Sequence, residues 1–278
     1  MQNIIETAVQ ALYRRLRAGK QRVIEAALLF HRESRWPELI ASFAEQRVLI
    51  LAPHMDDEVF GCGGVAIRHG AAGGEVEIVY LTDGRRGDVR LHDARITPAA
   101  ALAMEEEVVA VRRQEAEAAA ALLGVVKLHF MEAEDGRLGL DPTVAPRLAQ
   151  QMAGHPPDLV YLPSPFDTHA DHWQAVRIFV AAGARMPLAW RDSVRVRCYE
   201  VCAPVVANRL ADISGEMTQK LRAMAAHQSQ LRDRDFVRCV EGLNAYRAIG
   251  LPGGAGYAEA FFECSFSMLS LIAQRVTL

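Results

Sequence analysis

One imidazole and three carboxylates lie within five consecutive residues, directly after an apolar run. His54, Asp56, Asp57 and Glu58 follow residues 48–51, which the apolar pattern predicts to be a short strand. Carboxylates at the end of a buried strand are strongly disfavoured unless they are paired or bind a cation. A divalent cation would neutralise their charge and can bind both imidazole and carboxylate groups. An acidic first turn of a helix is the simpler alternative, although such a turn has no need of the histidine.

A second cluster of polar residues follows a second apolar run. Residues 159–162 lead into His169, Asp171 and His172. Two histidines and one carboxylate that leave coordination positions open are typical of catalytic rather than structural zinc sites. A metal held in this way lowers the pKa of a bound water to about 7 and polarises a carbonyl group. With Asp56 available as a base for that water, the two clusters together predict metal-assisted hydrolysis.

The elements that would position these clusters alternate between strand and helix from residue 47 onward. Apolar runs predict strands over residues 48–52, 76–82, 125–131, 159–162 and 194–201. One helix is expected after the first polar cluster and ends at residue 69, and others are expected over residues 101–123, 143–154 and 170–183. This alternation predicts an α/β fold with a mostly parallel sheet that is covered on both faces. Ligands of such sheets bind beyond the carboxyl ends of the strands, which is where both polar clusters fall.

Residues 1–46 are expected to form a helical extension of the α/β domain, which spans residues 47–278. Apolar residues recur at helical spacing, with arginines between them, over residues 5–16 and 23–28. Two amphipathic helices that pack on the domain or on a second copy of the chain would explain this pattern, and in the second case the protein is a homo-oligomer. A basic helix that lies on a membrane surface is the alternative.

Composition and charge argue against several classes of protein. The net charge of −3 gives no case for a nucleic-acid partner, which would usually require a basic surface. No apolar run approaches the roughly 20 residues of a transmembrane helix, and arginines interrupt any candidate secretory signal. The five cysteines are scattered and odd in number, which indicates free thiols in a cytoplasmic protein. The glycines of residues 61–64 lack the spacing of a dinucleotide-binding loop and are better explained by close helix packing.

The two clusters resemble the signatures of a known enzyme family, the LmbE-like or PIG-L metal-dependent N-deacetylases. Residues 53–64 resemble its first motif, Ala/Pro-His-Pro-Asp-Asp-Glu, and residues 169–172 its second, His-x-Asp-His. The resemblance extends over roughly residues 47–267, and Met55 stands where the family usually has proline. Because neither side chain is a hard metal ligand, we do not expect this difference to affect catalysis. Weaker resemblances follow in the same order at Thr82-Asp83-Gly84, Arg112 with Glu115, Lys220 with His227, Ser229 and Gln230, and residues 257–261.

The resemblance implies a Rossmann-like three-layer fold and a metal centre. By position in the motifs, His54, Asp57 and His172 would hold the metal, which is expected to be Zn²⁺. Fe²⁺ is an alternative, because two histidines and a carboxylate can also bind it. Glu58 is expected to support the helix N-terminus rather than to bind the metal.

The resemblance also implies roles in catalysis. Asp56 would be the general base, which takes a proton from the attacking water and passes it to the leaving amine, and His169 would stabilise the oxyanion. These are the tasks that amide hydrolysis requires. We expect Asp171 to orient one of the imidazoles that flank it. Arg112 is a candidate for binding a substrate hydroxyl or phosphate.

The function that follows is a zinc-dependent hydrolase that removes an N-acetyl or other N-acyl group from an amino sugar or an N-acetylglucosamine-containing conjugate. The small-molecule amino sugar would be its main partner. Two alternatives stay open: an amidase that acts on a non-sugar amide, such as that of a thiol-sugar conjugate, and a metal-binding module without turnover. The presence of Asp56 and His169 argues against the module, since a structural site would need neither.

Overall fold

An eight-stranded sheet forms the centre of the molecule. The computed structural model describes residues 36–275 with the exception of residue 126. The strand order is β1-β7-β8-β6-β5-β2-β3-β4, and all neighbouring pairs are parallel except those made by β8. The strands are β1 (Glu38–Leu39), β2 (Arg47–Ala52), β3 (Glu75–Thr82), β4 (Lys127–Ala133), β5 (Leu159–Pro163), β6 (Arg195–Tyr199), β7 (Arg209–Asp212) and β8 (Ala258–Ser265).

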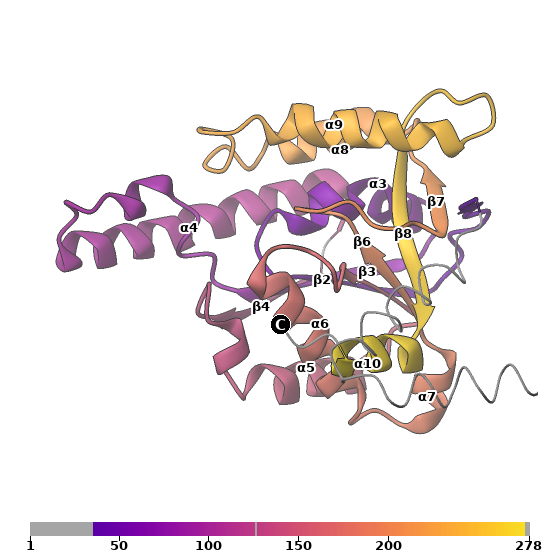
Figure 1. The fold of residues 1–278 in the computed structure, drawn as a ribbon, viewed down its shortest axis with the longest axis horizontal. Helices are drawn as coiled ribbons and strands as arrows, with labels where there is room; N and C mark the ends of the chain where they lie inside the picture. Colours follow the sequence, from indigo (N-terminus) through magenta and orange to yellow (C-terminus); the bar gives the residue numbers. More distant parts are fainter. Residues whose placement is uncertain (1–35, 126, 276–278) are drawn as a thin grey trace, which may run out of the picture.

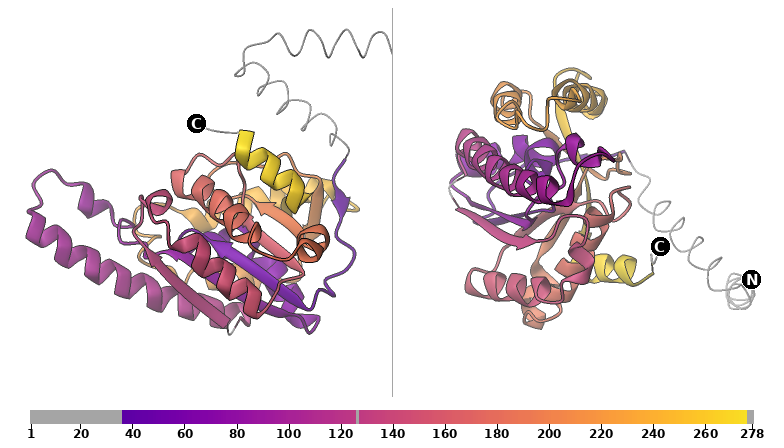
Figure 2. Two further views of the ribbon diagram at one scale, coloured as in Figure 1. Left: turned by 90° about the horizontal axis from the view of Figure 1, so that it is seen from below. Right: turned by 90° about the vertical axis from the view of Figure 1, so that its left-hand side faces the viewer.

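Helices cover both faces of this sheet (Figures 1 and 2). One face carries α3 (Asp57–Ala71), α4 (Pro98–Leu123), α8 (Met217–Met224) and α9 (Phe236–Arg247). The other face carries α5 (Val144–Gly154), α6 (Ala170–Gly183), α7 (Leu188–Ser193) and α10 (Phe266–Arg275). Short 3₁₀ turns lie at Val89–His92, Leu138–Leu140 and Ala248–Gly250. The predicted three-layer α/β fold is therefore confirmed.

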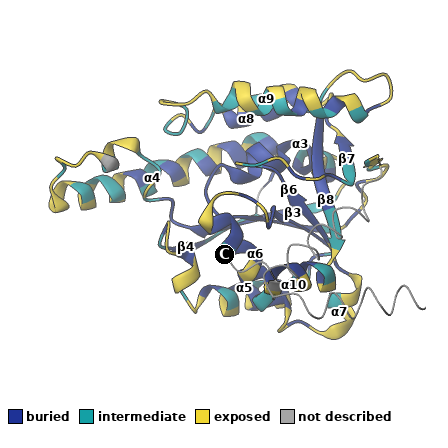
Figure 3. Ribbon diagram, in the orientation of Figure 1, coloured by how far each residue is buried: buried dark blue, intermediate teal, exposed yellow. Residues whose placement is uncertain are grey.

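The central strands read as continuous apolar runs because each of their faces packs against a helical layer. In β2, Val48 and Ile50 face the core shared with α3 and α4, whereas Leu49 and Leu51 face the core shared with α5 and α6. Figure 3 shows the consequence, a buried sheet between helices whose outer sides are exposed. This packing holds β2 in place, and with it the turn that follows the strand.

The chain order around β2 creates a crevice at the carboxyl edge of the sheet. From β2 the chain passes outward through β3 and β4, and then returns to the other side of β2 as β5. The loops that follow β2 and β5 therefore diverge, and ligands of such sheets bind between them. Both polar clusters of the sequence follow these two strands, as expected.

Part of the predicted helical extension is wrong. Residues 36–46 contain no helix; instead, Glu38–Leu39 forms β1, which pairs in parallel with β7, and Phe43 is buried in the core. The amide groups of Glu38 and Ile40 donate to carbonyls of Asn208 and Leu210. These hydrogen bonds pair the segment with the open edge of β7 as a strand, in place of the expected helix. Residues 1–35, including both predicted amphipathic helices, lie outside the described residues. In the described part of the chain no helix is long and apolar enough to cross a bilayer.

Candidate active site and metal centre

The carboxylate of Asp57 lies between the imidazoles of His54 and His172. Its Oδ2 atom is 3.1 Å from Nδ1 of His54, and its Oδ1 atom is 3.3 Å from Nε2 of His172. His54 belongs to the turn that follows β2, Asp57 opens α3, and His172 lies in the first turn of α6. All three side chains are buried. The structure thus brings together the three residues that the sequence suggests as metal ligands.

The three imidazoles at this point fit a divalent cation. His54, His169 and His172 each offer a ring nitrogen, and these atoms lie within 4.8 Å of one another. Burial alone would lower the pKa of both His54 and His172, but the surrounding carboxylates raise it, well above the usual value for His54 and to about 9 for His172. The site therefore favours positive charge at this point, which a cation with nitrogen and oxygen ligands would supply.

Further carboxylates contact the second ring nitrogen of each of the two candidate ligand histidines, the one that does not face Asp57. Asp135 Oδ1 and Asp171 Oδ2 lie 3.3 and 3.4 Å from Nε2 of His54, and Asp167 Oδ1 lies 3.2 Å from Nδ1 of His172. Such contacts fix the ring orientation of a metal-binding histidine and raise its basicity. Asp171 was expected to orient one of the imidazoles that flank it in its own motif. Instead, its carboxylate lies 3.4 Å from the imidazole of His54.

Asp135 and Asp167 were missed by the sequence reasoning. Asp135 follows β4 by two residues, and Asp167 follows β5 by four, so both occupy the carboxyl edge of the sheet. Their position a few residues after predicted strands was the available signal. Because many loops contain a single carboxylate, this position alone could not distinguish Asp135 and Asp167 from the others.

Asp56 is held beside the candidate metal centre by Arg112. Nη2 of Arg112 lies 3.1 Å from Oδ1 of Asp56 and donates to the carbonyl of Met55, and Nη1 donates to the carbonyl of Gly84. Burial raises the pKa of Asp56 to about 6, while the guanidinium opposes this shift. A carboxylate with a pKa near neutrality is suited to general base catalysis. Arg112 is itself buried by these protein contacts, and direct binding of the substrate by Arg112 stays a prediction.

His169 lies next to both ligand imidazoles at the exposed rim of the site. Its ring centroid is 4.7 Å from that of His54 and 4.8 Å from that of His172. Nδ1 of His169 accepts a hydrogen bond from the amide of Asp171, because His169 caps α6. Partial burial and the two neighbouring imidazoles lower its pKa. A neutral ring whose Nδ1 accepts a hydrogen bond carries its proton on Nε2, where it can donate to an oxyanion.

Glu58 supports the turn in the way that the sequence suggests. Its Oε2 atom accepts the amide of Asp56 and its Oε1 atom accepts the hydroxyl of Tyr80. Burial raises its pKa to about 8. His227 Nε2 lies 4.0 Å from Glu58, but His227 comes after the end of α8 at Met224. Lys220 and His227, which the sequence places seven residues apart, therefore do not lie on one helix face.

The glycines of α3 permit close packing, as the sequence interpretation holds. A Cβ atom on Gly61 would lie 2.2 Å from Cδ2 of Tyr199, and one on Gly64 would lie 2.5 Å from Cγ2 of Ile213. The helix that begins at Asp57 can therefore pack directly against the sheet and the segment after β7.

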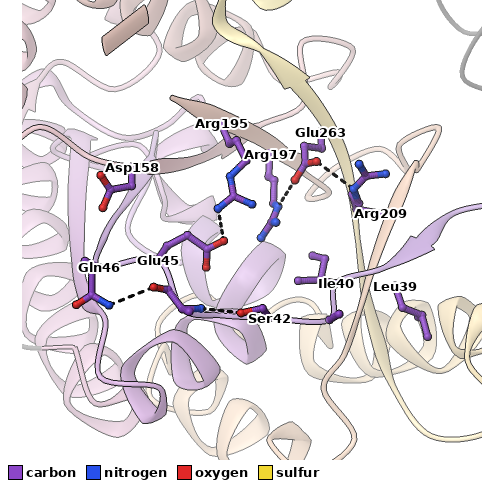
Figure 4. A pocket seen from close by; sticks show the side chains of 12 residues that line it. Leu39, Ile40, Ser42, Glu45, Gln46, Asp158, Arg195, Arg197, Arg209 and Glu263 are labelled. Atoms are coloured by element: carbon purple, nitrogen blue, oxygen red, sulfur yellow. Dashed lines mark hydrogen bonds and ion pairs between the residues drawn. The ribbon is translucent and has the colours of Figure 1, made fainter. Parts of the chain in front are cut away.

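A separate cavity of about 580 Å³ opens at the opposite, amino-terminal edge of the parallel strands (Figure 4). It lies between residues 39–46 and the start of β6. Its three arginines are paired with acids: Arg195 with Glu45, and Arg197 and Arg209 with Glu263. We therefore place the candidate active site at the carboxyl edge, where the buried imidazoles and carboxylates converge.

Comparison with known proteins points to one class of enzyme. Residues 49–183 match the model of the PIG-L family, which is described as GlcNAc-PI de-N-acetylase. This range contains both polar clusters and the residues that surround them, from His54 to His172.

Similar proteins include two curated deacetylases. The chain is 27% identical over 197 residues to diacetylchitobiose deacetylase of Thermococcus kodakarensis, a match that covers 66% of this chain and 70% of the relative. It is 27% identical over 164 residues to 1D-myo-inositol 2-acetamido-2-deoxy-alpha-D-glucopyranoside deacetylase of Salinispora arenicola, covering 51% of this chain and 52% of that protein. The solved structure of N,N'-diacetylchitobiose deacetylase from Pyrococcus horikoshii is similar with a TM-score of 0.69 and 25% identity, over 81% of this chain and 85% of that one.

Proposed function

Because this chain belongs to the PIG-L family, we propose that it is a metal-dependent hydrolase that removes the N-acetyl group from an N-acetylglucosamine-containing substrate. One observation carries the proposal: Asp57 lies between His54 and His172 while Asp56 is held beside it by Arg112. The proposed metal ligands and the proposed general base thus lie together in the crevice at the carboxyl edge of the sheet.

His54, Asp57 and His172 would hold the metal. We propose Zn²⁺, since two imidazoles and one carboxylate with open coordination positions are typical of catalytic zinc; Fe²⁺ is the alternative. When bound, such an ion polarises the acetamide carbonyl and lowers the pKa of water. Asp135, Asp171 and Asp167 would keep the two imidazoles in orientation through contacts of 3.2–3.4 Å.

The other residues of the site would move protons and stabilise charge. Asp56 accepts a proton from the attacking water and then delivers it to the amine nitrogen as the C–N bond breaks. Arg112 keeps Asp56 ionised and in place in a buried site. The Nε2–H group of His169 donates a hydrogen bond to the oxyanion that forms on the acetamide oxygen.

The two curated relatives favour a sugar substrate. Their names specify diacetylchitobiose and an inositol-linked acetamido sugar, so an N-acetylated glucosamine is the shared chemical group. We propose that group as the substrate of this chain, in preference to a non-sugar amide. Cytoplasmic location and assembly through residues 1–46 stay predictions from the sequence.

The substitution Asp56→Ala tests the assignment of the base. The variant should retain its metal, measured after equilibrium dialysis, but lose about 10²- to 10⁴-fold in the rate of amine release from N,N'-diacetylchitobiose, because general base catalysis contributes roughly that factor. Asp141→Ala, at a partly exposed residue outside the site, is the control and should keep wild-type turnover. Wild-type turnover in Asp56→Ala would show that the base is assigned wrongly.

Removal of the metal tests the cofactor. Treatment with a chelator should abolish turnover, and added Zn²⁺ should restore it; restoration by Fe²⁺ but not by Zn²⁺ would decide for the alternative. If the wild-type protein binds metal tightly but releases no amine from any N-acetylated sugar, the module without turnover is the correct description.

A further inference from the structure

Helix α3 contains a break five residues after Asp57. Cys62 has φ −150° and ψ 24°, which is not helical, and it divides the helix into two segments. The first segment carries Asp57 and Glu58, and the second runs onward to Ala71. The direction of the first segment decides where the Asp57 carboxylate lies relative to His54 and His172.

An ion pair occupies the break. In a regular helix the amide of Gly64 would donate to the carbonyl of Phe60, four residues earlier. Here the amide of Gly64 donates to Oε1 of Glu259 at 2.8 Å, and the carbonyl of Phe60 accepts from Nζ of Lys220 at 2.9 Å. Nζ of Lys220 lies 2.7 Å from Oε1 of Glu259. The two side chains thus take the place of one backbone hydrogen bond of the helix.

Glu259 also satisfies the start of the second helical segment. Its Oε2 atom accepts the amide of Val65 at 2.9 Å, so the carboxylate binds two consecutive amides. An anion at this position compensates for amides that have no partner in the helix and interacts favourably with the helix dipole. A Cβ atom on Gly63 would lie 3.3 Å from Cγ of Lys220, so the glycine allows the lysine to approach.

The ion pair is completely buried and fully hydrogen-bonded. Lys220 and Glu259 have no exposed side-chain surface, and Nζ of Lys220 also donates to Oδ1 of Asn244 at 2.9 Å. Burying two charges costs desolvation energy that a continuous helix, with its own hydrogen bond, would avoid. Stability alone therefore does not explain why the chain places an ion pair here.

We propose that Lys220 and Glu259 are positioning residues, which hold α3 open at Cys62 and thereby aim Asp57 at His54 and His172. The inference rests on the proposed function, because it concerns the same metal centre. Its consequence is that the ion pair determines the metal affinity of the protein, although neither residue is a metal ligand. Asn244 fixes the lysine from the other side and ties it to β8 through the carbonyl of Ala258.

The double substitution Lys220→Met with Glu259→Gln tests this proposal. It removes both charges together, so no unpaired charge stays buried, and the protein should fold, as judged by circular dichroism. Because methionine cannot donate to the carbonyl of Phe60, the break should shift. We expect the affinity of the metal-free protein for Co²⁺ to fall by about tenfold or more, as for the loss of other groups that orient ligands, and the visible spectrum of bound Co²⁺ to change.

A second ion pair, with a buried arginine and a partly exposed glutamate, provides the control. Arg197 and Glu263, 2.7 Å apart, lie at the opposite edge of the sheet. The double substitution Arg197→Met with Glu263→Gln should change the melting temperature but neither the Co²⁺ affinity nor the spectrum. Lys220→Arg, which keeps a cationic donor, should retain most of the Co²⁺ affinity.

The readout separates the two proposals. Wild-type Co²⁺ affinity and spectrum in folded Lys220→Met with Glu259→Gln would overturn the positioning role, whatever the substrate. A loss of Co²⁺ affinity in that variant, together with a wild-type protein that deacetylates no sugar, would support the positioning role and reject the proposed function. If the double variant does not fold, Glu259→Asp serves instead: it keeps the charge but withdraws the carboxylate from Gly64 and Val65, and unchanged Co²⁺ binding would overturn the inference.

Discussion

Nη2 of Arg112 lies 3.1 Å from Oδ1 of Asp56, and both side chains are buried. Burial by itself favours the protonated carboxyl group, in which form Asp56 could not accept a proton. The guanidinium opposes this effect, and its bonds to the carbonyls of Met55 and Gly84 hold it in position. The arginine therefore maintains the charge of the proposed base without belonging to either signature motif.

Replacing Arg112 with methionine should impair both catalysis and stability. The substitution leaves Asp56 buried without its counter-charge, and breaking a buried ion pair costs about 3–5 kcal/mol of unfolding free energy. We expect kcat to fall by more than tenfold, since Asp56 would be protonated in a larger fraction of molecules. Urea unfolding and steady-state kinetics would measure the two effects. Arg113→Met, at the neighbouring exposed arginine, is the control and should change neither quantity by much.

The amide substitutions Asp135→Asn and Asp167→Asn should weaken metal binding while leaving the three candidate ligands intact. Each carboxylate lies 3.2–3.3 Å from the ring nitrogen of His54 or His172 that does not face Asp57. Loss of such contacts typically costs 10- to 100-fold in metal affinity. Competition with a chromophoric chelator measures the affinity, and Asp141→Asn, at a partly exposed residue outside the site, is the control. Wild-type affinity in both variants would mean that the rings of His54 and His172 are oriented by other groups.

The residues that could be predicted from the sequence are those whose position follows from strand order. His54 and His172 each follow an apolar strand, and neighbouring parallel strands bring their carboxyl ends together. Asp57 could be added because it is three residues from His54, where a helix begins. These inferences needed only local pattern and the general geometry of α/β sheets.

The parts that the sequence did not reveal depend on long-range contacts. Arg112 was a candidate for substrate binding, but its ion pair with Asp56, 56 positions away in the chain, cannot be read from the local pattern. The break at Cys62 depends on Lys220 and Glu259, which lie far along the chain. Residues 36–46 were expected to belong to a helical extension. The pairing of Glu38–Leu39 with β7 could not be predicted from the spacing of apolar residues alone.

Three of the four glycines of α3 offer a test of its packing. Gly64→Ala would place a Cβ atom 2.5 Å from Cγ2 and 2.7 Å from Cβ of Ile213, so the helix or the segment after β7 must move. We expect a loss of about 1–3 kcal/mol, as in other overpacked cores, and a similar loss for Gly61→Ala, which meets Tyr199.

Gly70→Ala is the matched control for these variants. Gly70 belongs to the same helix, but a Cβ atom there would have no neighbour within 4 Å. Alanine should therefore stabilise the protein by about 0.5–1 kcal/mol through its higher helix propensity. Chemical denaturation of the three variants would measure the difference. If Gly64→Ala were as stable as Gly70→Ala, the close approach of α3 to Ile213 would be wrong.

His69 should make the protein sensitive to acid. Burial lowers its pKa to about 4, although Glu45 opposes the shift, and its Nε2 atom lies 3.0 Å from the hydroxyl of Tyr161. In the unfolded chain a histidine has a pKa of about 6.5, so the unfolded state binds more protons as the pH falls from 6.5 to 4. Stability must therefore decrease over this range, by up to about 1.4 kcal/mol per pH unit from this one residue.

The substitution His69→Gln isolates that contribution. Glutamine can hydrogen-bond to Tyr161 as donor or acceptor but does not titrate, so it removes the proton uptake on unfolding. Between pH 7 and pH 5, the unfolding free energy of the wild-type protein should fall by about 2 kcal/mol more than that of the variant, as the two pKa values require. Urea unfolding at the two pH values measures both differences. Equal losses in the two proteins would show that His69 takes up its proton in the folded state as readily as in the unfolded chain.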